Sequence, residues 1–288
     1  MTDKENFMYK IMGKISGTDA PLVFKGALIT KLILAEGGYT ALERQTKDVD
    51  ANWVGKLPSM KELVETINNS LGELQNQIYA VAFREYGDKM SAGVSVREKQ
   101  TDDEIITMDI DMRPIQGSKI YHYGEISVKG VFVNEILADK ISVLSKRMIF
   151  RRAKDIVDVY ALAHCVTVKT TEIYDMFKKN PDREIGAFDE FFNRQPDVEH
   201  AFEKLRDIDK KPPFDQVYNY LRSFIQPFAN KDIASRIWNS DKLSWEDYDI
   251  NLEAKPPMKK ILAEAKVKAD EYNANRQTPS RNKPHPER

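Results

Sequence analysis

Apolar residues recur at helical spacing in three stretches of the first 80 residues: 4–15, 23–38 and 60–79. Each stretch predicts an amphipathic helix. Gly37 and Gly38 supply a C-terminal stop for the second helix. The third helix begins after Pro58 and Ser59, and its apolar stripe consists of Leu63, Ile67, Leu71 and Leu74.

Apolar and polar residues alternate instead in four other segments, which predict strands at 46–54, 91–100, 104–114 and 119–131. The sequence TDDE separates the second from the third and predicts a turn. A mixture of strands and helices is therefore expected for the first half of the chain.

After residue 133 the alternation ends and helical periodicity returns. Six segments predict helices: 136–148, 153–166, 170–180, 197–208, 214–228 and 257–273. Strands grouped before helices indicate an α+β fold. We expect an α/β domain over 1–132, a helical domain over 133–275 and a disordered, polar tail over 276–288.

Composition narrows the classes of function. The 288 residues include one cysteine, Cys165, and four scattered histidines, which excludes a disulfide framework and a cysteine zinc site. No apolar run approaches the roughly 20 residues that span a bilayer, and the charged N-terminus lacks a signal-peptide core. We expect a cytoplasmic protein. The net charge of −1 means that an RNA partner needs a local basic patch.

Two aspartates flank Val49 in the segment RQTKDVD. On a strand, Asp48 and Asp50 project from the same face, about 6–7 Å apart along the backbone. Like charges this close repel unless a cation neutralises them, and magnesium prefers such hard oxygen ligands. The motif predicts a metal-binding pair, and a solvated strand edge is the alternative interpretation.

A second acidic pair, Asp109 and Asp111, lies in EIITMDIDMRP. It alternates with Ile106, Met108, Ile110 and Met112, which define a buried face. If this strand lies beside the first, a third carboxylate reaches the same metals, as two-metal phosphoryl transfer requires. A solvated acidic face is the alternative.

The segment Lys25-Gly26-Ala27 opens the helix that precedes the Asp pair. A helix N-terminus favours phosphate, and Gly26 would allow its close approach. Tight packing of the helix on a strand is the alternative reason for this glycine.

Farther along, Asp155 and Asp158 share a helix, where they pair with surface arginines or face a cleft between the two halves. Basic residues gather in the same region and form an RNA-binding patch or an ordinary solvated face: Lys146, Arg147, Arg151, Arg152 and Lys154.

The order of these motifs resembles the AbiEii/AbiGii-type nucleotidyltransferase toxins, which include the MenT toxins and belong to the DNA polymerase β-like superfamily. The resemblance covers about residues 20–165. It rests on KGA at 25–27, RQTKDVD at 44–50, DKI at 139–141 and RRAKDIVDVYAL at 151–162. The family's Gly-Gly or Gly-Ser is Gly26-Ala27 here, so the serine hydroxyl is absent.

The resemblance implies a metal-dependent toxin of a toxin–antitoxin or abortive phage infection system. The reaction is transfer of a nucleoside monophosphate from an NTP, with release of pyrophosphate, to an acceptor such as the 3′ end of tRNA. The implied catalytic residues are Asp48, Asp50, Asp109, Lys140 and Asp155. The implied nucleotide-binding residues are Lys25, Gly26, Ala27, Arg44, Thr46 and Lys140.

Asp48, Asp50 and Asp109 would bind Mg²⁺ or Mn²⁺, with Asp111 as the alternative to Asp109. The implied partner is an AbiEi-like antitoxin encoded nearby. Three other interpretations remain open: a nucleotidyltransferase of the same fold that modifies a protein or small molecule, a degenerate protein that binds nucleotide without catalysis, and a helical interaction protein.

Overall fold

Most of the chain folds around one large mixed sheet. The computed structural model describes residues 2–39, 43–87, 90–180, 183–206 and 208–249. Residues 1–246 form one unit, and residues 247–288 form a second, of which only 247–249 are described. The predicted helix at 257–273 and the predicted tail at 276–288 lie outside the described residues. The domain boundary at residue 132 stays a prediction.

Seven strands form the sheet in the order β4-β5-β6-β3-β1-β8-β7. Their bounds are β1 Leu22–Lys25, β3 Asp48–Trp53, β4 Ile78–Arg84, β5 Ser91–Glu98, β6 Glu104–Asp111, β7 Ser118–Tyr123 and β8 Ile126–Val131. The β3–β6 and β1–β8 pairs are parallel and the others are antiparallel. The predicted α+β class is confirmed.

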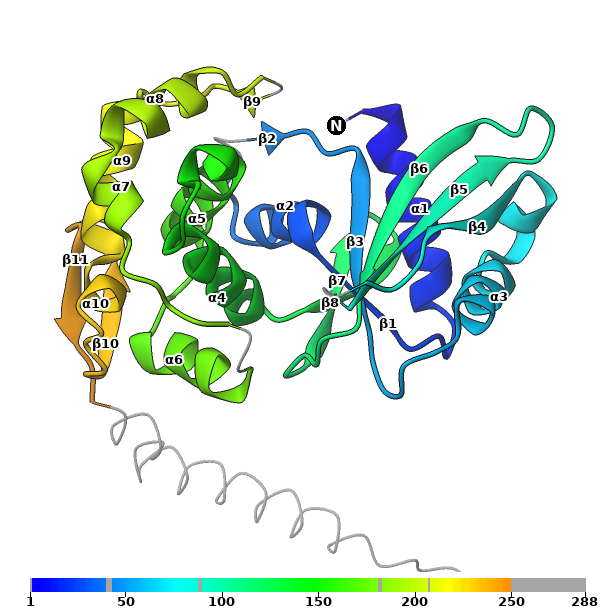
Figure 1. Ribbon diagram of the computed structural model, residues 1–288, viewed down its shortest axis with the longest axis horizontal. Helices are drawn as coiled ribbons and strands as arrows, with labels where there is room; N and C mark the ends of the chain where they lie inside the picture. Colours follow the sequence, from blue (N-terminus) through cyan, green and yellow to red (C-terminus); the bar gives the residue numbers. More distant parts are fainter. Residues whose placement is uncertain (1, 40–42, 88–89, 181–182, 207, 250–288) are drawn as a thin grey trace, which may run out of the picture. The chain divides into compact units, whose positions relative to one another are not determined.

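Helices cover both faces of this sheet (Figure 1). On one face lie α1 (Asp3–Ser16) and α3 (Met60–Ser70), and on the other lies α2 (Gly26–Glu36). Both α1 and α3 begin with a capping box, at Thr2 and Ser59 respectively, which explains where each helix starts.

The second half of the chain packs on the outer side of α2 through α4 and α5. Its helices are α4 Val133–Leu144, η2 Ile149–Arg152, α5 Ala153–Cys165, α6 Thr170–Lys179, α7 Asp189–Asn193, α8 Gln195–Glu203, α9 Phe214–Phe224 and α10 Gln226–Ala229. The described residues also contain two small strand pairs that the sequence did not predict: β2 (Glu43–Arg44) with β9 (Ile208–Asp209), and β10 (Arg236–Asn239) with β11 (Ser244–Asp247).

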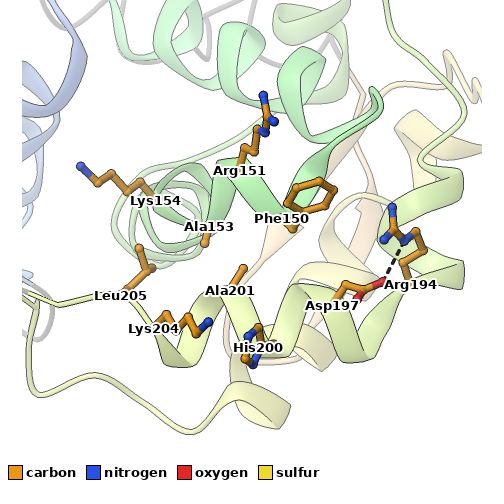
Figure 2. Close-up of a pocket in the computed structure, with 10 residues that line it drawn as sticks. All are labelled: Phe150, Arg151, Ala153, Lys154, Arg194, Asp197, His200, Ala201, Lys204 and Leu205. Atoms are coloured by element: carbon orange, nitrogen blue, oxygen red, sulfur yellow. Dashed lines mark hydrogen bonds and ion pairs between the residues drawn. The ribbon is translucent and has the colours of Figure 1, made fainter.

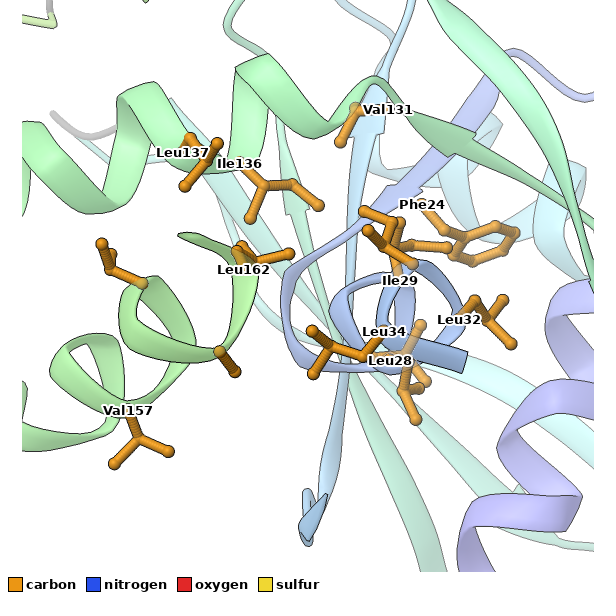
Figure 3. Packing of buried hydrophobic residues seen from close by; sticks show 14 of the residues in the cluster. Phe24, Leu28, Ile29, Leu32, Leu34, Val131, Ile136, Leu137, Val157 and Leu162 are labelled. Carbon is orange, nitrogen blue, oxygen red and sulfur yellow. The ribbon is translucent and has the colours of Figure 1, made fainter. Parts of the chain in front are cut away.

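Helix α2 is the centre of the core. Figure 3 shows its side chains Leu28, Ile29 and Leu32 near Phe24 of β1, with Leu162 of α5 across from them. All five side chains are at most 2% exposed. Burial on several sides explains why α2 is apolar around most of its circumference rather than along one stripe.

Three predicted elements in the first half of the chain are wrong in their extent, and in the second half the predicted helix at 136–148 ends at Leu144 and the one at 197–208 ends at Glu203. The predicted helix at 23–38 begins only at Gly26, because the residues before it form β1. The predicted helix at 60–79 ends at Ser70. A 3₁₀ turn, η1 (Gly72–Asn76), and strand β4 follow it, and Gly72 has a φ of +58°, which an α-helix does not tolerate. The predicted strand at 119–131 is a hairpin, β7–β8, which turns at Gly124 with a φ of +56°.

Among the described residues, no helix is long and apolar enough to cross a bilayer.

Candidate active site

Strand β3 presents Asp48 and Asp50 on the face of the sheet that α2 covers. Val49, between them, is fully buried on the opposite face, as the alternation predicts. Gly26, the first residue of α2, lies directly against the Asp50 carboxylate. A β-carbon at Gly26 would stand 2.0 Å from Asp50 Oδ2, and the residue has a φ of +71°. Only glycine satisfies both demands without strain.

Asp109 lies beside Asp50 on the neighbouring strand. The register of the parallel β3–β6 pair sets these two residues opposite each other. The Asp109 carboxylate accepts a hydrogen bond from Arg84 of β4 at 2.5 Å, and its side chain is 45% exposed. The strands that carry the two acidic pairs are therefore neighbours, as the sequence analysis required for a third carboxylate near Asp48 and Asp50.

Asp111, two residues further along, has a different environment. Its carboxylate accepts a hydrogen bond from Lys25 Nζ at 2.8 Å and from Arg113 Nε at 3.0 Å, and its side chain is 8% exposed. Burial would raise the pKa of Asp111, but Arg113 and Lys25 outweigh it and lower the pKa to about 2. Asp111 is a paired carboxylate that anchors two cations.

Asp50 has the opposite balance. Burial, together with the charges of Asp48 and Asp109, outweighs the attraction of Lys25 and Lys140 and raises the pKa of its carboxyl from 3.8 to about 6. A carboxylate with this surplus of negative neighbours gains from a bound cation.

Among the described residues, no three His, Cys, Asp or Glu side chains are arranged to hold a metal ion by themselves. Magnesium in enzymes that act on phosphates commonly takes one or two carboxylates and completes its shell with water and phosphate oxygens. Asp48 and Asp50 therefore fit Mg²⁺ as a partial ligand set of hard oxygens.

A buried ion-pair network joins Arg44 of β2 to helices α4 and α5. Lys140 Nζ donates to Asp158 Oδ2 at 2.7 Å and to Asp155 Oδ1 at 3.0 Å. Arg44 donates to the two oxygens of Asp158 at 3.2 and 3.0 Å. Burial alone would lower the pKa of Lys140, but Asp158 and Asp155 outweigh it and raise the pKa, so Lys140 is charged.

The segment that carries Arg44 and Thr46 is held at both ends. Arg44 pairs with Ile208 in the β2–β9 ladder, and the Thr46 amide donates to Glu5 Oε1 at 3.1 Å. Glu5 is fully buried and forms an ion pair with Lys31 of α2. Contacts with α1, α2 and the C-terminal half thus hold the segment that leads into β3.

These elements enclose a cavity of about 340 Å³, within the range of ligand pockets. Its lining includes nine of the ten predicted site residues: Lys25, Gly26, Ala27, Arg44, Thr46, Asp48, Asp50, Lys140 and Asp155. Asp109 does not line it. The basic cluster divides: Arg151, Arg152 and Lys154 line this cavity, whereas Lys146 and Arg147 line a separate one.

Three residues that the structure brings to the site were not among the predicted catalytic or nucleotide-binding residues. Asp158 was expected to pair with a surface arginine or to face a cleft, yet it is buried and joins Lys140 to Arg44. Arg84 pairs with Asp109. Asp139 lines the cavity and accepts a hydrogen bond from Arg183 at 2.5 Å. Arg84 lies 25 positions before Asp109 in the sequence, and Asp139 lies 44 positions before Arg183. Spacings of this length do not indicate either pair.

A mixed sheet that presents paired aspartates beside a glycine-led helix N-terminus, with a buried lysine opposite, has the chemical groups that suit an enzyme of phosphoryl or nucleotidyl transfer. The particular family follows from the sequence. Residues 10–226 match the family described as "Nucleotidyl transferase AbiEii toxin, Type IV TA system". The chain belongs to this family of toxin nucleotidyltransferases.

The solved structures to which the chain is similar include three nucleotidyltransferases or related proteins. The MenT4 nucleotidyltransferase toxin of Mycobacterium tuberculosis H37Rv is 16% identical, with a TM-score of 0.47, over 80% of this chain and 82% of that one. An antigenic nucleotidyltransferase-like protein of Paracoccidioides brasiliensis is 12% identical, with a TM-score of 0.40, over 75% and 97%. The Megavirus polyadenylate synthase is 11% identical, with a TM-score of 0.32, over 93% and 49%.

No curated protein matches the chain. The family assignment rests on the family match rather than on these distant structural likenesses.

Proposed function

We propose that this protein transfers a nucleoside monophosphate from an NTP to a hydroxyl of an RNA acceptor, and that the 3′ end of a tRNA is the acceptor. The observation that supports it most is the cavity that combines a carboxylate pair, a helix N-terminus without a side-chain cap and four cationic side chains from α4, η2 and α5: Lys140, Arg151, Arg152 and Lys154.

The triphosphate is proposed to lie at the start of α2. Lys25 occupies the N-cap of α2, and no side chain caps the helix, so the first backbone N–H groups can donate to phosphate oxygens. Because Gly26 has no β-carbon, the Asp50 carboxylate lies directly against the start of α2. These backbone donors replace the serine hydroxyl that Gly26-Ala27 lacks.

Asp48 and Asp50 are the residues that would hold Mg²⁺ or Mn²⁺ in this cavity. When bound, the ion neutralises the phosphates and favours loss of the acceptor proton. Asp109, in register with Asp50, is proposed to accept that proton, since its carboxylate is the third one on this face and is partly exposed. Asp111, bound to Lys25 and Arg113, is the weaker candidate.

Lys140 is proposed to stabilise the negative charge that develops on the leaving pyrophosphate. Asp155 and Asp158 fix its position and keep it protonated, and Arg44 is held beside it by Asp158. Preorganised charge of this kind is the main contribution that a protein makes to phosphoryl transfer.

Family membership supports a proposal for the biological setting. A toxin of this family has an antitoxin partner, and we propose that the partner is AbiEi-like and encoded nearby, that the pair acts in abortive phage infection, and that the protein works in the cytoplasm.

Four α-labelled NTPs, each incubated with the protein, magnesium and total RNA or protein-only lysate, test the proposal. We expect label from at least one NTP on RNA, and none with Asp48→Ala. Asp103→Ala, an exposed aspartate on the β5–β6 turn, is the matched control and should retain transfer. Label on protein or on a small molecule would contradict the RNA acceptor. Absence of any magnesium-dependent transfer would indicate a protein that binds nucleotide without catalysis.

A further inference from the structure

A second cavity, of about 510 Å³, lies in the C-terminal half of the chain (Figure 2). It adjoins the 340 Å³ cavity, which is the proposed transfer site. Phe150 and Arg151 of η2 and the start of α5 form one side. Residues of α8 and the turn after it, from Asp197 to Leu205, form the other. Arg151 and Lys154 line this cavity and the 340 Å³ cavity alike. The two cavities are therefore neighbours that share a wall of positive charge.

The charge of the second cavity is largely uncompensated. Arg151, Lys154 and Lys204 are exposed, and none of the three makes an ion pair within the part of the chain that the structure describes. Asp197 is the one acidic residue in the lining, and it already accepts a hydrogen bond from Arg194 at 2.8 Å. Three cations that face a shared space without partners favour a polyanionic ligand.

The cavity also contains an aromatic ring suited to stacking. The Arg194 guanidinium carbon lies 5.3 Å from the centre of the Phe150 ring. Bases of single-stranded RNA stack on such rings and on arginine planes. Figure 2 shows two small residues, Ala153 and Ala201, on the two sides of the cavity.

We propose that this cavity binds the single-stranded end of the acceptor RNA. One nucleotide stacks on Phe150, and its flanking phosphates contact Lys204, Arg151 and Lys154, so that the terminal hydroxyl enters the transfer site. This inference rests on the proposed function and adds to it the place where the acceptor is held. A volume of 510 Å³ lies in the range that accommodates a nucleotide-sized ligand. The shared cations give the phosphate chain a continuous path between the two cavities.

Single-stranded RNA fits these features better than an acidic protein segment does. An acidic peptide would use the cations but not require a ring beside them, whereas an RNA strand uses both. The shared wall also ties occupancy of this cavity to the transfer site, as an acceptor strand requires.

Two variants that touch only the second cavity test the proposal. Ala201→Phe fills the space without a change in charge, and Lys204→Glu reverses one exposed charge. Neither residue lines the transfer site. Lys10→Glu, an exposed lysine on α1, is the control for charge reversal. Thermal unfolding verifies that each variant folds, and Lys204→Glu remains informative if the larger side chain at position 201 disturbs packing.

Transfer is measured with a single-stranded RNA of about ten nucleotides and with a dinucleotide too short to span both cavities. We expect KM for the longer RNA to rise about tenfold in both variants, with unchanged KM for NTP and unchanged transfer to the dinucleotide. Lys204→Glu should also reduce the slope of log KM against log salt by about 0.7, the value for one phosphate contact.

Unchanged KM for the longer RNA in both variants would overturn the proposal. So would a variant that loses binding to a protein partner but transfers to RNA as the wild type does, because the cavity would then be a protein-docking site. If the wild-type protein transfers label to no RNA, the proposed function itself fails. That result is distinct from a wild type that transfers and variants that do so equally.

Discussion

Replacement of Asp158 by asparagine isolates the ion-pair network that links α4, α5 and Arg44. Asp158 accepts three hydrogen bonds, two from Arg44 and one from Lys140. The side chains of Asp158, Lys140 and Arg44 are only 7%, 10% and 12% exposed. Asparagine preserves the volume but removes the charge, so two buried cations lose a shared counter-ion.

Loss of one partner from a buried ion pair costs about 3–5 kcal/mol. Asp155 still pairs with Lys140 after the change, so we expect the lower end, about 3 kcal/mol. That is a large share of the stability of an ordinary domain. Asp155→Asn is the matched control. Its side chain is 18% exposed and shares Lys140 with Asp158, so we expect a loss of about 1 kcal/mol.

Urea unfolding of the wild type and both variants, monitored by tryptophan fluorescence with the slope m compared, measures these losses. The network lowers the pKa of Asp158 from 3.8, because Lys140 and Arg44 outweigh the opposing effect of burial. A lowered pKa stabilises the folded state above pH 4 and ceases to do so as the pH falls through the folded-state value. The gap between wild type and Asp158→Asn should therefore narrow below pH 4.

Two results would contradict this role of Asp158: a smaller loss of stability in Asp158→Asn than in Asp155→Asn, or a deficit of Asp158→Asn that is the same at pH 3 as at pH 7. Either result would mean that the three hydrogen bonds to Asp158 do not offset the cost of burying these charges.

Three further changes probe the strands and the helix N-terminus. Gly26→Ala should cost more than 2 kcal/mol in urea unfolding, because its φ is +71° and its β-carbon would overlap Asp50, whereas Gly124→Ala, with a φ of +56° and open space around it, should cost about 1 kcal/mol; equal losses would contradict the close approach. Asp111→Asn should lose about 2 kcal/mol at pH 7, since its pKa of about 2 stabilises the fold above pH 4, and the deficit should disappear as the pH falls from 4 to 2; a deficit that persists at pH 2 would contradict the ion pairs. Asp109→Asn, half-exposed, should abolish nucleotide transfer with less than 1 kcal/mol lost in stability, and retained transfer would exclude Asp109 as the third carboxylate.

The sequence predicted the α+β class and most elements because their apolar patterns are local. It was wrong where one apolar run continues from a strand into the next helix. Residues 22–24 are buried on both faces as a strand, and periodicity cannot distinguish such a strand from the start of a helix. Gly72 and Gly124, with positive φ, divide what the pattern had joined. A glycine in the sequence does not reveal its φ.

Part of the candidate site could likewise be predicted from the sequence, and part of it could not. Asp48, Asp50 and Gly26 belong to short motifs whose residue types already indicate phosphate and metal chemistry. The bond between Arg44 and Asp158 joins residues 114 positions apart, and it depends on how α5 packs against α2. No local pattern encodes that distance, so the role of Asp158 emerges only from the fold.

The most direct test of the central claim is single-turnover nucleotide transfer by wild type, Asp50→Asn and Asp103→Asn, with stability and NTP binding measured on the same preparations. We expect Asp50→Asn to stay folded and to lose transfer by at least about a thousandfold, on the scale of lost electrostatic stabilisation in active sites, whereas Asp103→Asn should transfer as the wild type does. Transfer by Asp50→Asn within tenfold of the wild type would contradict the claim that this cavity is where the nucleotide is transferred.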